Sequence, residues 1–350
     1  MRDIFELSNK EFLESAANLS FWPINNIEFN EEISNFINSS VKLIRANYQD
    51  DSFENNLIKC CNPFFAKKLL HDYYTERCIT YFDERKSQNS DFTVLLQFLN
   101  HEILEPIYLK PLRHGFRKSQ SLNHSNFKLS FIDFIRNLKD RHGFKKTTNI
   151  ELANNGILST GGGDIAGRYK KFFKNDVFLY RMESIFPQRV NADSQQFKDE
   201  RNYLQNSVRF NTFYQDLISL LQHPFSPQNA NSIYSWYFEF LTFSSLFFKQ
   251  LENAKFAPRE IWTSSMGILW NSLLAIHGKN IGAKVVTFDH ANGANMALDS
   301  TTAFIDCQFC DTYVVTSNIY KKYILSSLEL SLYNPSNAPE IISIESLERE

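Results

Sequence analysis

The stretch REIWTSSMGILWNSLLAIHGKNIGAKVVTFDH, residues 259–290, decides the fold class. It opens with a β-rich run, REIWTS, and closes on another, AKVVTF. Between these runs, apolar residues recur at helical spacing: Met266, Leu269, Leu273 and Ile276. This spacing predicts a helix with one buried stripe, which starts at Ser264 or Ser265 and ends near Gly278. The stretch therefore predicts a βαβ unit with two parallel strands.

The same alternation of strand, loop and helix occurs on both sides of this unit. Upstream, GILSTGGGDIAGRYKKFF (156–173) predicts a strand, a glycine loop and a short basic helix, and DVFLYRMES (176–184) predicts another strand. Downstream, DTYVVTSNIYKKYI (311–324) predicts a further strand and a helix that begins at Ser317. We therefore expect an α/β fold over residues 151–330, with a Rossmann-like parallel sheet flanked by helices.

Residues outside this α/β part have a different character. Residues 1–105 lack glycine, and FFAKKLLHDYYTERCITYFDERK (64–86) places apolar residues at helical intervals, so we expect a helical region there. We expect residues 106–150 to form a basic connecting segment and residues 331–350 an acidic tail. The run SIYSWYFEFLTFSSLFFKQL (232–251) is apolar nearly all round, which favours a helix buried in the core over one that lies on lipid.

Composition limits the classes of function. Hydrophobic residues make up 43% of the 350 residues, which is enough for a substantial core, and the net charge of −2 argues against nucleic-acid binding. The opening residues do not form a signal peptide, and no uncharged apolar run reaches the roughly 18 residues of a membrane span. The 5 cysteines are odd in number and lack the spacing of a disulfide framework. We therefore expect a cytoplasmic protein.

Polar residues follow both strands of the βαβ unit, where ligands gather in parallel sheets. Ser264 and Ser265 follow the first strand. After the second strand come Asp289, His290, Asn292, Gly293 and Asn295. Asp289 and His290 supply a carboxylate and an imidazole for proton transfer, although neighbours at a strand end normally point to opposite faces. We expect the other residues to bind substrate. The structural alternative is an Asp289 that caps the loop and a His290 packed on the next helix.

A second candidate site is the glycine loop that follows the strand near residue 157. The site residues expected there are Gly161, Gly162, Gly163 and Arg168, with Arg181 and Glu183 after the next strand. Backbone amides of such a loop can hold a phosphate, and Arg168 adds positive charge. The pattern Gly161-x-Gly163-x-x-Ala166, followed by Glu183, also fits a loose dinucleotide-binding pattern. An ordinary turn and an ordinary ion pair between Arg181 and Glu183 are the alternatives.

Two further segments have a charge pattern or a cysteine pair that bears on ligand binding. Between Lys110 and Lys146 the chain is basic, which fits a solvated surface or a landing site for a phosphorylated substrate or an anionic membrane. Cys307 and Cys310 form a lone CxxC pair, which is half of a zinc site. The D-x-D spacing of metal-dependent transferases is missing. We therefore expect no metal.

The strand that ends at the histidine, its loop and the segment DTYVVTSN together resemble bacterial surface-polysaccharide glycosyltransferases of the GT-B type. The resemblance covers about residues 255–325. It includes the teichoic-acid CDP-glycerol transferases and the capsule and lipopolysaccharide enzymes that transfer Kdo. Those enzymes carry a second Rossmann-like domain beyond this point, whereas 26 residues follow Ile324 here. We therefore expect either a truncated GT-B-like chain or a donor held by the preceding residues, with the loop of Gly161 to Gly163 as its phosphate contact.

The resemblance implies transfer of a sugar from a nucleotide-activated donor, with CMP-Kdo as one candidate, to a bacterial surface glycan or lipid-linked acceptor. It implies that His290 is catalytic or contacts phosphate, that Asp289 is the base or nucleophile, and that Ser264 and Ser265 line the same cleft. Glu183 is a further catalytic candidate. The donor is a co-substrate, no separate cofactor is implied, and the enzyme would work at the inner face of the cytoplasmic membrane. An NAD(P)-dependent enzyme and a non-catalytic module of a polysaccharide assembly complex are the alternatives.

Overall fold

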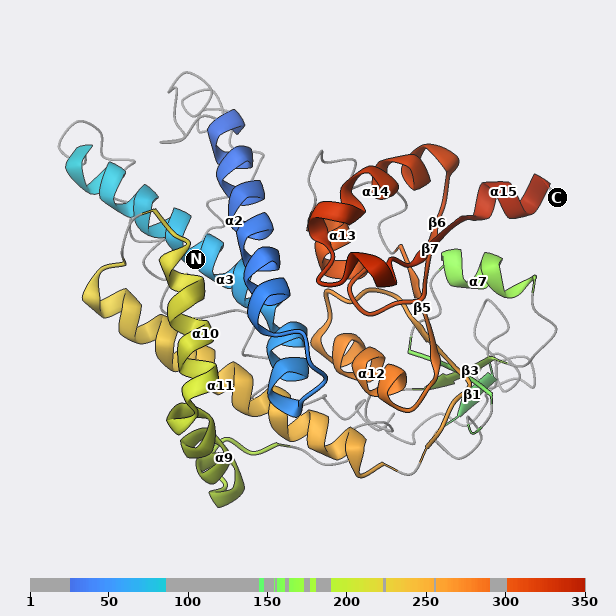
Figure 1. Cartoon of the computed structure of the whole chain (residues 1–350), viewed down its shortest axis with the longest axis horizontal. Coiled ribbons are helices and arrows are strands. Elements are labelled where there is room, and N and C mark those ends of the chain that lie inside the picture. The colour runs from blue at the N-terminus through green and yellow to red at the C-terminus, as the bar shows by residue number, and fades with distance from the viewer. Residues whose placement is uncertain are drawn as a thin grey trace, which may run out of the picture.

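The structure is a computed structural model of the 350-residue chain. It describes residues 26–85, 145–147, 154, 156–160, 164–172, 177–180, 190–222, 225–254, 256–289 and 301–349. Figure 1 shows a group of long helices on one side and a β-sheet with its own helices on the other. This mixed α/β architecture, with a parallel sheet flanked by helices and with helices before it in the chain, agrees with the fold class predicted from the sequence.

The helical part consists of α2 (Asn26–Asn47), α3 (Phe53–Arg85), α9 (Gln195–Asn206), α10 (Val208–Ser219) and α11 (Pro227–Glu252). Its centre is α11, which is apolar on nearly all sides and packs against both α3 and α9. The ring centroid of Tyr237 lies 4.4 Å from that of Phe65 on α3, and the centroid of Phe243 lies 4.8 Å from that of Phe197 on α9. The buried helix predicted for residues 232–251 is therefore confirmed.

The sheet consists of β1 (Lys145–Thr147), β2 (Ile157–Ser159), β3 (Val177–Tyr180), β4 (Glu260–Thr263), β5 (Lys284–Phe288), β6 (Thr312–Val315) and β7 (Glu340–Ser343). Its strand order is β1-β3-β2-β4-β5-β6-β7, and every neighbouring pair is parallel. Parallel strands are buried on both faces, which explains why the central strands are continuous apolar runs. Strand β3, which follows β2 in the chain, lies on one side of β2, and β4 lies on the other side.

The βαβ unit predicted for residues 259–288 is confirmed, because α12 (Leu269–Asn280) connects β4 to its parallel neighbour β5. The predicted start of the helix is wrong. Ile268 is the N-cap of α12, and Ser264 and Ser265 belong to the loop that follows β4. The reason is that both serines lie too far before the helix, within a loop that Ser265 itself helps to fold.

The helix α12 ends at Asn280, close to the predicted end, but Gly278 is not the residue that ends it. Gly278 lies inside the helix, where its missing side chain leaves room for Ile261 of β4; a Cβ atom there would overlap the Ile261 Cδ1 atom. The turn after the helix is made instead by Gly282, whose φ of 79° is in the left-handed region that favours glycine. Gly278 therefore allows close helix–strand packing, and Gly282 allows the chain to reverse.

Residues 331–349 belong to the fold, so the acidic tail expected for residues 331–350 is a wrong prediction over this range. After η2 (Pro335–Asn337), β7 pairs with β6, and the short helix α15 (Ile344–Arg349) follows. Ile341 and Ile344 are both buried. The apolar residues of this strand provide a buried edge for the sheet, although acidic residues surround them in the sequence.

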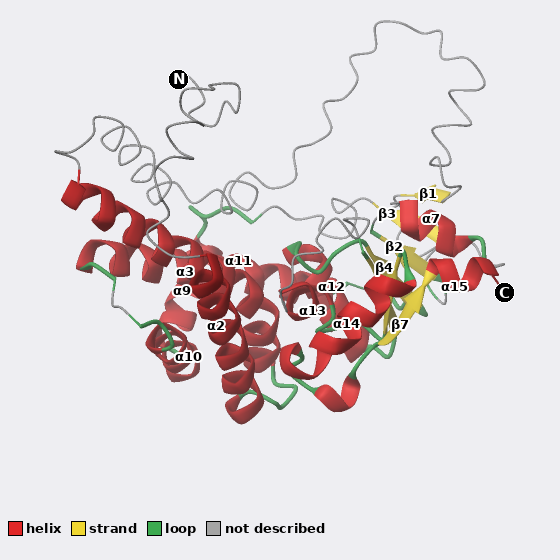
Figure 2. Cartoon of the chain, turned by 90° about the horizontal axis from the view of Figure 1, so that it is seen from above, coloured by secondary structure: helices red, strands yellow, loops and turns green. Residues whose placement is uncertain are grey.

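The two faces of the sheet have different coverings. One face carries Leu158, Ile261, Val285, Tyr313 and Ile341, and we call it the helix-rich face, because α12, α13 (Thr301–Asp306) and α14 (Asn318–Ser331) pack on it, with the helical part beyond them. The other carries Ile157, Trp262, Val286, Phe288 and Val314. Among the residues that the structure describes, α7 (Asp164–Lys170) and α15 cover that second face, which we call the short-helix face. Figure 2 shows this difference from above.

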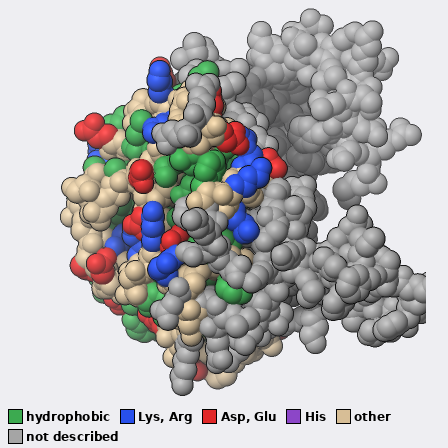
Figure 3. Space-filling view, turned by 90° about the vertical axis from the view of Figure 1, so that its right-hand side faces the viewer, with side chains coloured by type: hydrophobic (Ala, Val, Ile, Leu, Met, Phe, Trp, Pro, Cys, Tyr) green, Lys and Arg blue, Asp and Glu red, His purple; other side chains and the backbone are tan. Residues whose placement is uncertain are grey.

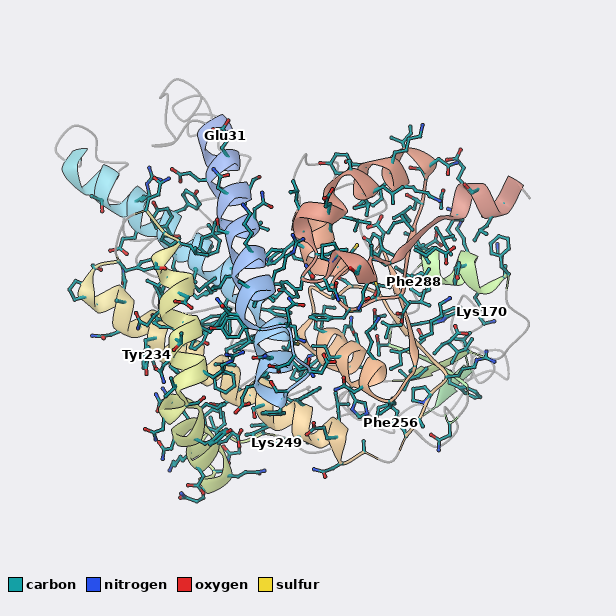
Figure 4. All side chains as sticks on the ribbon, viewed as in Figure 1. Glu31, Lys170, Tyr234, Lys249, Phe256 and Phe288 are labelled. Atoms are coloured by element: carbon teal, nitrogen blue, oxygen red, sulfur yellow. The ribbon has the colours of Figure 1, made fainter. Side chains whose placement is uncertain are left out.

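The short-helix face is held by aromatic contacts. The Tyr169 ring of α7 lies 5.5 Å, centroid to centroid, from both Trp262 and Phe288. Figure 4 labels Phe288 on the sheet and Lys170 on the nearby α7, with Tyr234 and Lys249 of α11 on the opposite side of the molecule. Figure 3 views the molecule from the side on which α7 and α15 lie, and it shows hydrophobic side chains gathered between charged ones.

The helical part is joined to the sheet part by one continuous hydrophobic core and by hydrogen bonds to the end of α14. Arg45 of α2 donates from Nε to the Leu332 carbonyl oxygen at 2.8 Å, and Asn62 of α3 donates from Nδ2 to the Tyr333 hydroxyl at 3.0 Å. Buried residues of α2, α3 and α11 share that core with residues of β4, β5 and β6. Among the described helices, none is both long enough and apolar enough to cross a membrane.

Candidate functional site

The strand order contains a topological switch point between β2 and β4. The two strands are parallel neighbours, with Leu158 opposite Ile261. The helix after β2, α7, packs on the short-helix face, whereas the helix after β4, α12, packs on the helix-rich face. Because the two connections leave in opposite directions, the carboxyl ends of these strands separate there, and ligands of open α/β sheets bind at such points. We use "switch point" for this junction, with Thr160 on one side and Ser264 on the other.

The two sides of the switch point are in direct contact. The backbone N–H of Thr160 donates to the Trp262 carbonyl oxygen at 2.9 Å, which continues the ladder beyond the last residue of β2. The loop after β4 then runs from Ser264 to Ile268 before α12 begins. Ser264 is partly exposed, and its hydroxyl makes no hydrogen bond with the described residues. It is therefore the predicted serine whose hydroxyl remains available to a ligand.

Ser265 has a different role from Ser264. Its side chain is 5% exposed, and its hydroxyl donates to Oδ1 of Asp306 at 2.8 Å and accepts from the Gly267 N–H at 3.0 Å. Oδ1 of Asp306 also accepts from the Met266 N–H at 2.8 Å. These hydrogen bonds use the hydroxyl and two backbone amides of the loop. Ser265 therefore shapes the loop instead of presenting its hydroxyl at the surface.

The amino end of α12 faces the switch point without a capping side chain. Its N-cap is Ile268, whose side chain has no oxygen to accept from the first-turn amides and which is 45% exposed. Ser, Thr, Asn or Asp normally occupies this position. An uncapped helix start carries partial positive charge and favours a negatively charged ligand.

The carboxyl end of β5 lies directly beside that of β4, as predicted from the sequence. Thr263 and Thr287 are opposite each other, and their hydroxyl oxygens are 3.0 Å apart. Asp289 follows, 4% exposed, and its backbone N–H donates to the Val314 carbonyl oxygen at 2.9 Å. Burial raises the pKa of the Tyr313 hydroxyl on β6, and the nearby Asp306, Cys307 and Asp289 raise it further. Asp289 is therefore a buried carboxylate one strand away from the switch point.

Several predicted site residues lie outside the described residues: Gly161, Gly162, Gly163, Arg181, Glu183, His290, Asn292, Gly293 and Asn295. The basic segment between residues 110 and 144 lies outside them as well. Their roles stay predictions.

Arg168 is described, and its guanidinium is already paired. It donates from Nε to Oε1 of Glu348 at 3.0 Å and from Nη2 to Oε2 at 2.6 Å. These hydrogen bonds hold the pKa of the Glu348 carboxyl below its usual value. The pair joins α7 to α15 across the short-helix face, so a phosphate bound by Arg168 would have to compete with Glu348.

No group of three or more His, Cys, Asp or Glu side chains that could hold a metal ion occurs within the described part of the chain. Cys307 and Cys310 are free thiols and both are buried. Burial raises the pKa of the Cys307 thiol well above its usual value, which disfavours the thiolate that metals and oxidants need.

Hollows between the described helices include two that lie away from the strand ends and contain charged side chains. One, of about 80 Å³, lies between α2, α3 and the end of α10 and includes Glu32, whose carboxylate is paired with Arg77 at 2.9 Å. The other, of about 170 Å³, lies between α9 and α11 and includes Lys249, which is paired with Glu200 at 2.6 Å. In both hollows the charged side chain already has a partner of opposite charge. We therefore do not choose either hollow as the candidate site.

Sequence reasoning missed the residues that hold the switch point together: Thr160, Asn271 and Asp306. Asp306 comes 41 positions after Ser265 in the chain, and Asn271 comes 111 positions after Thr160. Only a cue of residue type was present, since a buried Asn or Asp next to an apolar helix start needs hydrogen-bond partners. Comparisons with protein-family models, with curated proteins and with solved structures found no match for this chain.

Proposed function

We propose that this chain is a glycosyltransferase that binds a nucleotide-activated sugar at the switch point, with CMP-Kdo as one candidate donor. The sugar would pass to a bacterial surface glycan or a lipid-linked acceptor at the inner face of the cytoplasmic membrane. The observation that supports the proposal is the topology: β2 and β4 are parallel neighbours whose following helices cover opposite faces. Nucleotides and related ligands bind at this place in open α/β sheets.

The chemistry of sugar transfer suggests a role for the groups at these strand ends. Negative charge that develops on the departing phosphate needs hydrogen-bond donors or positive charge. The uncapped start of α12 supplies partial positive charge, and the Ser264 hydroxyl supplies a donor. The acceptor hydroxyl must lose a proton, and Asp289 is the carboxylate at the neighbouring strand end that would take it. The resemblance adds His290 as the phosphate contact.

A second candidate function uses the same switch point. In dinucleotide-binding sheets, the glycine loop follows the strand at the switch point. The strand in that position here is β2, and Gly161, Gly162 and Gly163 come directly after it in the sequence. An NAD(P)-dependent enzyme is therefore the alternative.

The test uses one substitution that should change stability and ligand affinity in opposite directions. Asp in place of Ile268 would cap α12 and is expected to raise the free energy of unfolding by about 0.5 to 1 kcal/mol. Its negative charge at the same helix end is expected to weaken CMP or UDP binding by about tenfold. The measurements are urea unfolding and calorimetric titration of the full chain with CMP, UDP and NAD⁺.

Val208→Asp is the matched control, because it adds the same charge at the start of α10 in the helical part, at a residue that is 80% exposed. It should leave nucleotide affinity unchanged. Full nucleotide affinity in Ile268→Asp would contradict the placement of the ligand at α12. Binding of NAD⁺ without CMP or UDP would favour the second function, and binding of none of the three by the wild type would reject both.

A further inference from the structure

Asn271 connects the two sides of the switch point. It lies in the first turn of α12 and is 1% exposed. Its Oδ1 atom accepts from the Thr160 hydroxyl at 2.9 Å, and its Nδ2 atom donates to the Ser265 carbonyl oxygen at 2.6 Å. One side chain thus holds both the end of β2 and the loop after β4. These are the two segments between which a ligand would lie.

Other hydrogen bonds fix the same loop from one side only. Ser272, which follows Asn271 in α12, donates from its hydroxyl to the Met266 carbonyl oxygen at 2.6 Å. Asp306 accepts from the Ser265 hydroxyl and the Met266 N–H. Together these contacts leave the loop little freedom near Ser264. Without Asn271, the loop would keep these contacts but lose its side-chain link to Thr160, and the hydrogen bonds from Thr160 to the Trp262 carbonyl oxygen of β4 would remain.

The side-chain amide of Asn271 suits this link, and neither a carboxylate nor an apolar side chain could make the same two hydrogen bonds. An amide offers an acceptor and a donor at once, and both are used here. Aspartate would lack the donor and would bring a charge into a buried position, and leucine would leave the Thr160 hydroxyl and the Ser265 carbonyl without their partner.

We propose that Asn271 is a positioning residue, which acts through Thr160 and Ser265 to hold the two sides of the switch point at the separation that the ligand needs. This inference rests on the proposed function, since it concerns the affinity of the same site. A ligand that contacts both sides binds more tightly when their separation is fixed before it arrives, because less conformational entropy is lost on binding. Asn271 itself need not touch the ligand.

The experiment removes the link at Thr160, where the change is smallest. Thr160→Val deletes the hydroxyl at nearly constant volume, and Thr160→Ser keeps the hydroxyl. We expect Thr160→Val to weaken CMP or UDP binding about five- to tenfold and Thr160→Ser to restore most of the affinity. Asn271→Ala should weaken binding further. If Asn271→Ala does not fold, the comparison of Thr160→Val with Thr160→Ser still tests the positioning role.

Thr242→Val is the matched control for loss of a buried threonine hydroxyl. Thr242 is fully buried in α11, and its hydroxyl donates to the Phe238 carbonyl oxygen at 2.6 Å. It should lower the melting temperature about as much as Thr160→Val does and leave nucleotide affinity unchanged. If the link between Thr160 and Asn271 only stabilised the fold, Thr160→Val and Thr242→Val would have the same nucleotide affinity.

Three results would overturn the inference. If the wild type binds a nucleotide and Thr160→Val binds it equally well, the proposed function stands and the positioning role fails. If Thr160→Ser is as weak as Thr160→Val, the hydroxyl is not the reason for the loss, and the positioning role fails again. If the wild type binds neither CMP nor UDP, the proposed function fails, and the positioning role fails with it.

Discussion

The same strands contribute to both faces of the sheet, but different contacts stabilise the two faces. On the helix-rich face, long helices with many aromatic residues form one core that continues into the helical part. On the short-helix face, the described covering is α7 and α15, which rest on an aromatic cluster and on the Arg168–Glu348 ion pair. Burial of apolar surface is worth much more than an exposed ion pair. Substitutions on the two faces should therefore have very different costs.

The largest expected effect is in the core behind the helix-rich face. Phe243→Ala removes a fully buried ring from α11, 4.8 Å from the Phe197 ring, and should lower the free energy of unfolding by about 3 to 5 kcal/mol. Urea unfolding followed by circular dichroism measures it. The control is Phe172→Ala beyond the end of α7, where the side chain is 44% exposed and the expected change is within about 0.5 kcal/mol. Equal losses in the two variants would contradict the comparison.

A smaller loss is expected in the aromatic cluster of the short-helix face. Tyr169→Leu keeps most of the buried volume but removes the ring contacts with Trp262 and Phe288. The expected cost is about 1 to 2 kcal/mol in urea unfolding. Burial raises the pKa of the Tyr169 hydroxyl to about 12, so the hydroxyl is neutral under these conditions. A loss as large as that of Phe243→Ala would mean that α7 contributes as much as the long helices.

A pH-dependent effect is expected from His277 of α12, on the helix-rich face. Burial lowers its pKa, its Nε2 atom has no hydrogen-bond partner among the described residues, and the Phe256 ring lies 5.5 Å away. Below about pH 6.5 the unfolded chain binds a proton that the folded chain resists, so stability falls as the pH falls. The wild type should lose more stability than His277→Phe between about pH 7.5 and about pH 5.5. Parallel curves for the two proteins would show that His277 does not cause the pH dependence.

The smallest effect is expected from the ion pair on the short-helix face. The side chains of Arg168 and Glu348 are 33% and 44% exposed, so water and salt screen the pair. Arg168→Ala, Glu348→Ala and the double variant should all melt within the error of the wild type, at low and at high salt. A clear coupling between the two substitutions would mean that this pair holds α15 in place.

The sequence predicted most of the sheet part and little of the contacts around it. Strands and helices with strong periodicity, such as β4, α12 and β5, were found because their burial patterns are local. The start of α12 and the role of Gly278 were predicted wrongly, because Ser265 pairs with Asp306 and Gly278 packs on Ile261, and neither contact is local. The strand β7 was missed, because its four residues lie within an acidic segment and become a strand only by pairing with β6.

For the candidate site too, the sequence predicted what depends on local pattern and missed what depends on distant contacts. Ser264 and Asp289 were identified from their places after apolar runs, and both do lie at the carboxyl edge of the sheet. The sequence placed the ligand between the ends of β4 and β5, whereas the strand order places the switch point between β2 and β4. Thr160 carried no signal of its own and Asn271 only that of its residue type, because their hydrogen bond joins positions 111 apart in the chain.

The amino-acid sequence by itself determined the parallel α/β sheet, the βαβ unit and the buried α11, because hydrophobic spacing within a short stretch fixes the period of a strand or helix and the side it buries. Only the tertiary structure decided which strands are neighbours, which face each helix covers and which polar residues meet at the switch point. Those features depend on contacts between residues far apart in the chain, and local spacing does not encode them.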